Sequence, residues 1–136
     1  MREVTQVTAI EVLPDPLSVC RLASDASLPE WAMRAGAFFS VTRTADELSI
    51  ICATAHVPPA TASVARDDGW RALKLIGPFA FTEVGILLGV AAPLAAAGIS
   101  ILPIATFETD YVLVPEVRLA SALAELRLVG HTVEHR

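Results

Sequence analysis

Charged residues are scarce in this sequence of 136 residues, at 18%, whereas hydrophobic residues make up 54%. This balance excludes a disordered chain, because disorder requires much charge and little apolar surface. Lysine and arginine never cluster beyond a pair, so the basic footprint of a nucleic-acid-binding protein is missing. The formal net charge of −5 favours solubility and suits small cationic or zwitterionic ligands. The length allows one ordinary domain or two very small ones that share a core.

Cysteine is equally scarce. Cys20 and Cys52 lie in apolar, strand-like runs, so we expect buried free thiols, with a disulfide or a reactive thiol as the alternatives. The three histidines, His56, His131 and His135, show no metal-ligand spacing with each other or with the cysteines. We therefore predict no metal site and no cofactor.

Targeting and membrane signals are also lacking. No basic segment followed by an apolar stretch opens the chain, so we expect no signal peptide and a cytoplasmic protein. The longest apolar run, Val84 to Ile104, is long enough to raise the question of a membrane span. Pro93, Gly98 and Ser100 interrupt this run, which favours a buried helix of about four turns followed by a strand.

Catalytic motifs are missing as well. The sequence has no G-x-S-x-G, no phosphate-binding glycine loop and no H-E-x-x-H. Ser18, next to Cys20, has no base that the sequence identifies. We therefore predict that the protein is not an enzyme; a small enzyme on the same scaffold remains the alternative, because fold does not fix function.

The second half of the chain has clear signals for helices and strands. Thr82 is a good N-cap, Glu83 suits the helix dipole, and Gly98 is a left-handed C-terminal stop. Pro93 should kink the helix or loosen one hydrogen bond. The expected order is strand, helix, strand, strand, helix, strand, over Trp70 to Ile76, Glu83 to Ala97, Ser100 to Ala105, Tyr111 to Val114, Glu116 to Leu128 and His131 to Glu134. Such an order gives an antiparallel sheet with two helices on one face.

The first half predicts three strands, Leu17 to Leu22, Ala37 to Thr42 and Glu47 to Thr54. Ser24 to Gly36 reads as a short irregular or helical stretch. Pro58-Pro59 opens a short polar helix or loop that ends near Asp67-Asp68-Gly69.

An internal echo links the two halves. Thr42 to Asp46 and Thr106 to Asp110 both have the form T-x-x-x-D, 64 residues apart, and each lies between two apolar strands. Two fixed positions in five match easily by chance, but the shared setting favours two copies of one fold, the first of them degraded.

At this point the sequence resembles a known family, the ACT domains of the CASTOR type, which occur in animal arginine sensors, in aspartokinase regulatory regions and in small bacterial proteins. The resemblance is carried by Phe81 to Ile86, Ala92 to Ala95, Gly98 to Ile101, Ala105 to Val114 and, more weakly, by Phe38 to Thr42 with Glu47 to Ile50. It implies an α+β fold of two tandem ACT (ferredoxin-like βαββαβ) units, a degenerate one over residues 1–68 and a complete one over residues 69–136. The sequence departs from the family over Ser24 to Gly36, where a full helix should stand.

The resemblance also implies a ligand, a small amino acid held where two ACT units meet. Its pocket falls on the strand-to-helix turn and the hairpin turn, which gives Ala80, Glu83, Val84, Gly85, Ile86, Thr106, Phe107, Thr109 and Asp110 as the predicted site. The chemistry agrees, because N–H groups at a helix start can bind a carboxylate and the two acids can pair with an ammonium.

Each of these residues also has a purely structural interpretation. Asp110 is then a turn residue, Glu83 a partner of the helix dipole, Thr82 a cap and Phe107 a packed turn residue. Trp31 and Trp70 are expected in the core or in an interface. The expected partners are a free amino acid, a second copy in a homodimer and an unidentified regulated protein; an interaction module that has lost its ligand is a further alternative.

Overall fold

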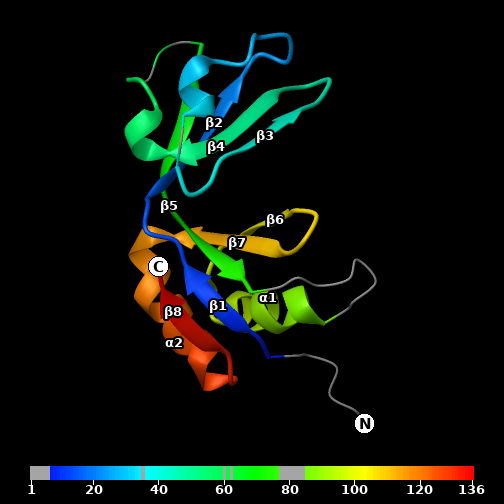
Figure 1. Ribbon diagram of the computed structural model, residues 1–136, viewed down its shortest axis with the longest axis vertical. Helices are drawn as coiled ribbons and strands as arrows, with labels where there is room; N and C mark the ends of the chain where they lie inside the picture. Colours follow the sequence, from blue (N-terminus) through cyan, green and yellow to red (C-terminus); the bar gives the residue numbers. More distant parts are fainter. Residues whose placement is uncertain (1–6, 35, 60, 62, 77–84) are drawn as a thin grey trace. The chain divides into compact units, whose positions relative to one another are not determined.

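The computed structural model describes residues 7–34, 36–59, 61, 63–76 and 85–136 (Figure 1). It divides into two compact units. The inserted unit comprises Asp15–Trp70, and the composite unit comprises Met1–Pro14 with Arg71–Arg136. Among the described residues no helix is long and apolar enough to cross a membrane.

The described residues of the inserted unit form a four-stranded antiparallel sheet with two short 3₁₀ helices. Its strands β3, β4 and β2 and the first part of β5 lie side by side in that order. The elements are β2 (Leu17–Leu22), η1 (Glu30–Met33), β3 (Ser40–Arg43), β4 (Leu48–Ala53), η2 (Thr54–His56) and β5 (Ala65–Leu75). In chain order this is βαββαβ with both helices reduced to a turn, so the predicted degenerate unit is confirmed.

In its described part, the composite unit has five strands and two α-helices. β5 continues from the inserted unit, and its last residues pair with β1 (Ala9–Val12) and with β7 (Asp110–Pro115). β7 pairs in turn with β6 (Leu102–Ala105). β1 lies between β5 and β8 (Thr132–His135), antiparallel to the first and parallel to the second. Without β1, the order would be that of a ferredoxin-like sheet.

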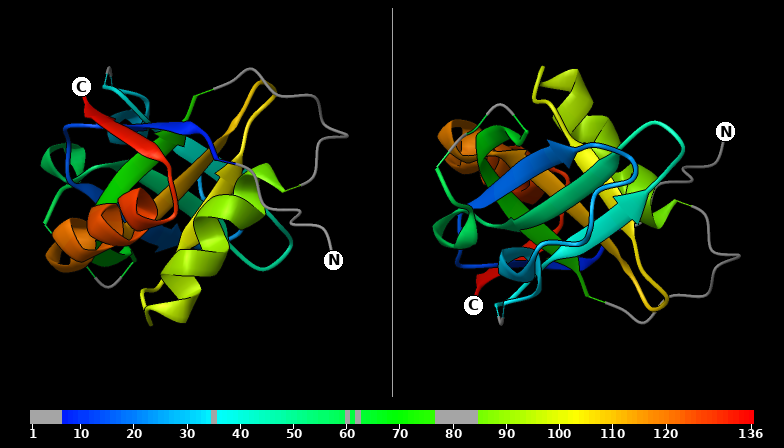
Figure 2. Two further views of the ribbon diagram at one scale, coloured as in Figure 1. Left: turned by 90° about the horizontal axis from the view of Figure 1, so that it is seen from below. Right: turned by 90° about the horizontal axis from the view of Figure 1, so that it is seen from above.

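Both α-helices of the composite unit lie on the same face of its sheet (Figure 2). Alternate strand residues point to that face and pack against α1 (Ile86–Ala96) and α2 (Leu119–Leu128), which follows the 3₁₀ turn η3 (Glu116–Arg118). The core includes Ile10, Val12, Leu73, Leu75, Val112 and Val114 from the strands and Ile86, Val90, Leu94, Ala122, Leu123 and Leu126 from the helices. The predicted α+β fold with helices on one face is confirmed.

Both α-helices end at the glycines that the sequence predicts as stops. Gly98 has a φ of 74°, and Ile99 N–H donates to the Leu94 carbonyl at 3.0 Å. Gly130 has a φ of 103°, and His131 N–H donates to the Leu126 carbonyl at 3.1 Å. These bonds satisfy carbonyls that a helix C-terminus leaves without partners.

One prediction is wrong. Asp67-Asp68-Gly69 does not end a loop but lies inside β5. Leu17 pairs with Trp70 and Val19 with Asp67, so β5 has one extra residue at this place, a β-bulge. Gly69 has a φ of 84°, which suits such a bulge. These residues do change the direction of the chain, but they do so as a bulge within a strand and not as a turn between two elements.

The division of the chain also differs from the predicted one. Residues 1–14 group with the C-terminal half, because β1 pairs with β5 and β8. The sequence predicts no strand before Leu17. A parallel partner 123 residues away leaves no local signal in the sequence, as the register of Ala9 with Thr132 illustrates.

Candidate functional site

The hairpin turn of the composite unit is built by threonines. Thr106 N–H donates to the Thr109 carbonyl at 2.8 Å, and Thr106 Oγ1 donates to the same oxygen at 3.0 Å. Thr109 is buried, and its Oγ1 donates to the carbonyl of Leu75. The turn is therefore fixed to the end of β5, the strand that leads toward the predicted strand-to-helix turn.

The predicted site residues have different environments. Phe107 is 81% exposed at the tip of the turn, whereas Asp110 is partly buried at the start of β7. Gly85 precedes α1 with a φ of 94°, and its carbonyl accepts the N–H of Gly89 at 2.8 Å. Ile86 is buried in the same core as Leu75. Ala80, Thr82, Glu83 and Val84 lie outside the described residues.

The two units do contain equivalent hairpin turns, but the residues correspond in a different register from the predicted one. In the inserted unit Thr44 N–H donates to the Glu47 carbonyl at 2.9 Å, as Thr106 does to Thr109. Both turns have four residues, because Arg43 pairs with Leu48 and Ala105 with Asp110. Thr44 therefore corresponds to Thr106, 62 positions later, and the predicted spacing of 64 was wrong by two residues. Asp46 is not the counterpart of Asp110.

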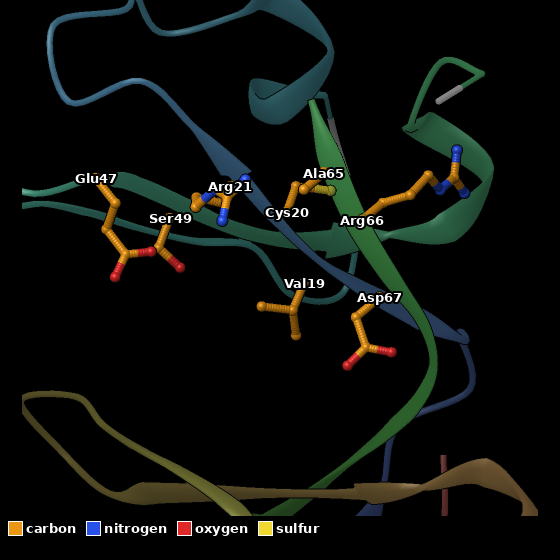
Figure 3. Close-up of a pocket in the computed structure, with 8 residues that line it drawn as sticks. All are labelled: Val19, Cys20, Arg21, Glu47, Ser49, Ala65, Arg66 and Asp67. Carbon is orange, nitrogen blue, oxygen red and sulfur yellow. The ribbon is translucent and has the colours of Figure 1, made fainter. Parts of the chain in front are cut away.

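A shallow cavity of about 250 Å³ opens on the inserted unit. Its lining is Val19, Cys20, Arg21, Glu47, Ser49, Ala65, Arg66 and Asp67 (Figure 3). The cavity forms because Arg21 has two small cross-strand neighbours, Ser49 and Ala65. It combines a guanidinium with two carboxylates, so it could accept a zwitterion. None of the predicted site residues that the structure describes lines it.

Ser18 has a partner that the sequence did not reveal. It is fully buried, and its Oγ donates to Asp68 Oδ1 at 2.6 Å. Arg66 Nε lies 3.0 Å from the same carboxylate oxygen. The hydrogen bond from Ser18, followed by that from Arg66, holds the pKa of Asp68 below its usual range. Because Ser18 is buried, it cannot reach a substrate. Ser18 and Asp68 are 50 residues apart, so no short sequence motif contains both.

Both cysteines are free and buried, as predicted. Burial raises the pKa of Cys20, and burial together with the neighbouring Cys20 raises the pKa of Cys52 to about 11. Thiols with a raised pKa are poor nucleophiles and poor metal ligands at neutral pH. Within the described ranges no three His, Cys, Asp or Glu side chains gather as a metal site.

His131 has a structural role that the sequence did not reveal. It is 4% exposed, and its Nε2 lies 2.6 Å from the Gly89 carbonyl. Its Nδ1 accepts the N–H of Thr8 at 3.0 Å, so Nε2 carries the proton and donates to Gly89. Gly89 needs this donor because Pro93, four residues later, has no N–H. The loosened hydrogen bond predicted at Pro93 is thus replaced by a histidine.

Trp31 and Trp70 are both partly buried. Trp31 packs against the core of the inserted unit, as expected. Trp70 Nε1 is buried and has no hydrogen-bond partner among the described residues.

Family models match both parts of the chain. A model of the ACT domain matches residues 65–127, and a model of an N-terminal domain matches residues 15–60. A solved protein from Agobacterium tumefaciens is 36% identical, with a TM-score of 0.88 over 97% of this chain and 96% of that one. The chain contains an ACT domain, over residues 65–127. The recognition made from the sequence is confirmed.

Other known proteins are similar over part of the chain or in fold. The human protein named cytosolic arginine sensor for mTORC1 subunit 1 is 44% identical over 59 residues, which are 43% of this chain and 18% of that protein. This chain thus matches about a fifth of the length of its curated relatives. The regulatory subunit of aspartate kinase from Thermus thermophilus is 10% identical, with a TM-score of 0.62 over 92% of this chain and 99% of that one, and shares the fold.

Proposed function

We propose that this protein is a non-catalytic regulatory protein that binds a free amino acid in its composite unit. The proposed site lies between the strand-to-helix turn, residues 80–86, and the hairpin turn, residues 106–110. One observation carries the location: Thr109 Oγ1 donates to the Leu75 carbonyl, which fixes the hairpin turn to the end of the strand that leads into residues 80–86.

The chemistry of the hairpin turn suits an amino acid. A partly buried carboxylate at Asp110 can pair with an ammonium or a cationic side chain. The ring of Phe107, at the tip of the turn, can cover a cation with its face. Gly85, which has no side chain, lets a ligand approach the start of α1 closely.

Arginine is the first ligand to test, because relatives that are 44% identical over 59 residues are named arginine sensors. The acidic chain also favours a cationic amino acid. Binding would act by linkage: the ligand stabilises the arrangement of the protein for which it has the higher affinity, and a regulated protein responds to that arrangement. A cytoplasmic location agrees with the name of these relatives.

The composite unit also supports a homodimer. α1 has no polar side chain in its eleven residues, yet Leu88 is 49% exposed and Ala92, Ala95 and Ala96 are exposed. A helix that is apolar on all sides is normally buried. We therefore propose that a second copy covers this face.

Thermal melts with each of the twenty amino acids test the proposed function. A ligand that binds only the folded state at 100 times its Kd adds about 2.7 kcal/mol to the free energy of unfolding. This corresponds to a rise in Tm on the order of 10 °C for a chain of this size. If no amino acid raises the Tm at millimolar concentration, the sensor proposal is wrong and the module without a ligand is favoured.

Two matched variants then locate the ligand. Asp110→Ala should abolish the ligand-induced rise and leave the Tm of the free protein nearly unchanged. Arg21→Ala, which removes the guanidinium from the cavity of the inserted unit, should leave the rise intact. The opposite pattern would move the site to that cavity, and a badly destabilised Asp110→Ala would show that Asp110 only closes the turn.

A further inference from the structure

The two hairpins carry very different side chains at the position just before the turn. Both have a four-residue turn that begins with a threonine bonded to the carbonyl of the fourth residue. The residue before the threonine is Arg43 in the inserted unit and Ala105 in the composite unit, as the pairs Arg43–Leu48 and Ala105–Asp110 show. The same backbone thus carries a long cation in one unit and a methyl group in the other.

The guanidinium of Arg43 is held by two main-chain carbonyls. Its Nη1 donates to the carbonyl of Ser24, and its Nη2 donates to the carbonyl of Ala26 at 2.8 Å. These carbonyls belong to a turn that follows β2, closed by a bond of 3.0 Å from Ala26 N–H to the Ala23 carbonyl. A planar guanidinium, with donors in a fixed fork, matches two such oxygens, whereas an ammonium has no matching geometry.

The contact of Arg43 with this turn connects two parts of the inserted unit. Residues 23–29 connect β2 to η1, the first strand and the first helix of the inserted unit. Arg43 therefore joins the hairpin of its unit to the strand-to-helix connection of the same unit. These are the two places at which an amino acid is proposed to bind in the other unit.

We propose that the carbonyls of Ser24 and Ala26 form a binding site for a guanidinium group, and that Arg43 of the same chain occupies it as an internal ligand. The strand-to-helix connection of the inserted unit is then closed to free ligands. In the composite unit the corresponding residue is Ala105, whose methyl group cannot act as an internal ligand of this kind. Combined with the proposed function, this predicts one amino acid bound per chain. The site formed by the carbonyls of Ser24 and Ala26, called the guanidinium cradle below, does not depend on that function.

Chemical rescue tests the cradle. Arg43→Ala should lower the Tm, and millimolar methylguanidinium should recover at least half of the loss with a saturable dependence on concentration. Methylammonium at equal concentration should not, because it cannot bridge the two carbonyls. The bonds of Arg43 are exposed to solvent, so a small cation can enter the emptied site. In ¹⁵N NMR spectra methylguanidinium should shift the amides of residues 23–27.

Three controls make the result decisive. The wild type should show no saturable gain with methylguanidinium, because Arg43 fills the site. Arg21→Ala should show none either, because it removes an exposed arginine from β2, elsewhere in the same sheet, and leaves the Ser24 and Ala26 carbonyls bound to Arg43. Arg43→Gln, which keeps most of the stem, replaces Arg43→Ala if the latter does not fold.

Equal responses of variant and wild type, equal rescue by methylammonium, or amide shifts away from residues 23–27 would each overturn the proposal. None of these readouts involves an amino acid bound to the composite unit. A failed rescue therefore contradicts the internal ligand, and flat amino-acid melts contradict only the proposed function.

Discussion

At the scale of single residues, Pro93 and His131 act as a pair. A proline inside a helix leaves one carbonyl without its N–H partner, here that of Gly89. His131 supplies the missing donor from the turn after α2, and its other nitrogen accepts the N–H of Thr8. One buried ring thus joins α1, the start of β8 and the residue before β1, all within the composite unit.

Removing the ring should be costly. His131→Phe keeps a planar ring but leaves the Gly89 carbonyl and the Thr8 N–H without partners. We expect the free energy of unfolding to fall by about 2–4 kcal/mol, since each buried group that loses its partner costs about 1–3 kcal/mol. Urea denaturation measures the loss, and His135→Phe, at an exposed position in β8, the strand that follows His131, should be nearly neutral.

A double-mutant cycle should show the coupling. Pro93→Ala restores an N–H that can reach the Gly89 carbonyl, so His131→Phe should cost about 1 kcal/mol less in that background. Strictly additive effects of Pro93→Ala and His131→Phe would mean that the histidine acts only through Thr8 or through packing.

At the scale of elements, glycines decide where chains bend and stop. Gly98 and Gly130 end the two α-helices in the same way, with an N–H from the following residue on a helix carbonyl. Gly69 uses the same left-handed backbone for a bulge inside β5. A sequence shows that a glycine can take a positive φ, but the pairing partners decide whether the result is a turn or a bulge.

The bulge gives a test at this scale. A Cβ at Gly69 would meet no atom within 4 Å, so Gly69→Ala introduces no clash, only an unfavourable φ. We expect a loss of about 1–2 kcal/mol in the free energy of unfolding. Gly36→Ala, where the added Cβ would touch His56 at an ordinary 3.6 Å and no positive φ is involved, is the control and should not be destabilising. Equal effects at both glycines would contradict the bulge geometry.

At the scale of the whole molecule, the apolar helix α1 is the main reason to expect self-association. Leu88→Glu places a charge on its exposed side. Light scattering after size exclusion should show a dimer for the wild type and a monomer for Leu88→Glu, because the buried charge would lack a partner. Val117→Glu adds the same charge at a residue that is 91% exposed on η3 and should stay dimeric. A monomeric wild type would refute the dimer.

The sequence by itself determined most of the composite unit. Its strands and helices follow from local periodicity and from stop signals such as Gly98 and Gly130, all of which act over a few residues. It also identified the family and the burial of the two cysteines. The predicted ligand site remains a prediction, since its residues lie on two turns that no local pattern brings together.

Only the tertiary structure decided the rest, because the deciding contacts join distant residues. It placed β1 between β5 and β8, made Asp67-Asp68-Gly69 a bulge, and set the correspondence of the hairpins at 62 residues. It brought Ser18 to Asp68 and His131 to Gly89. Such pairs provide hydrogen-bond partners for buried polar groups. Because the partners are far apart in the chain, no local sequence pattern predicts them.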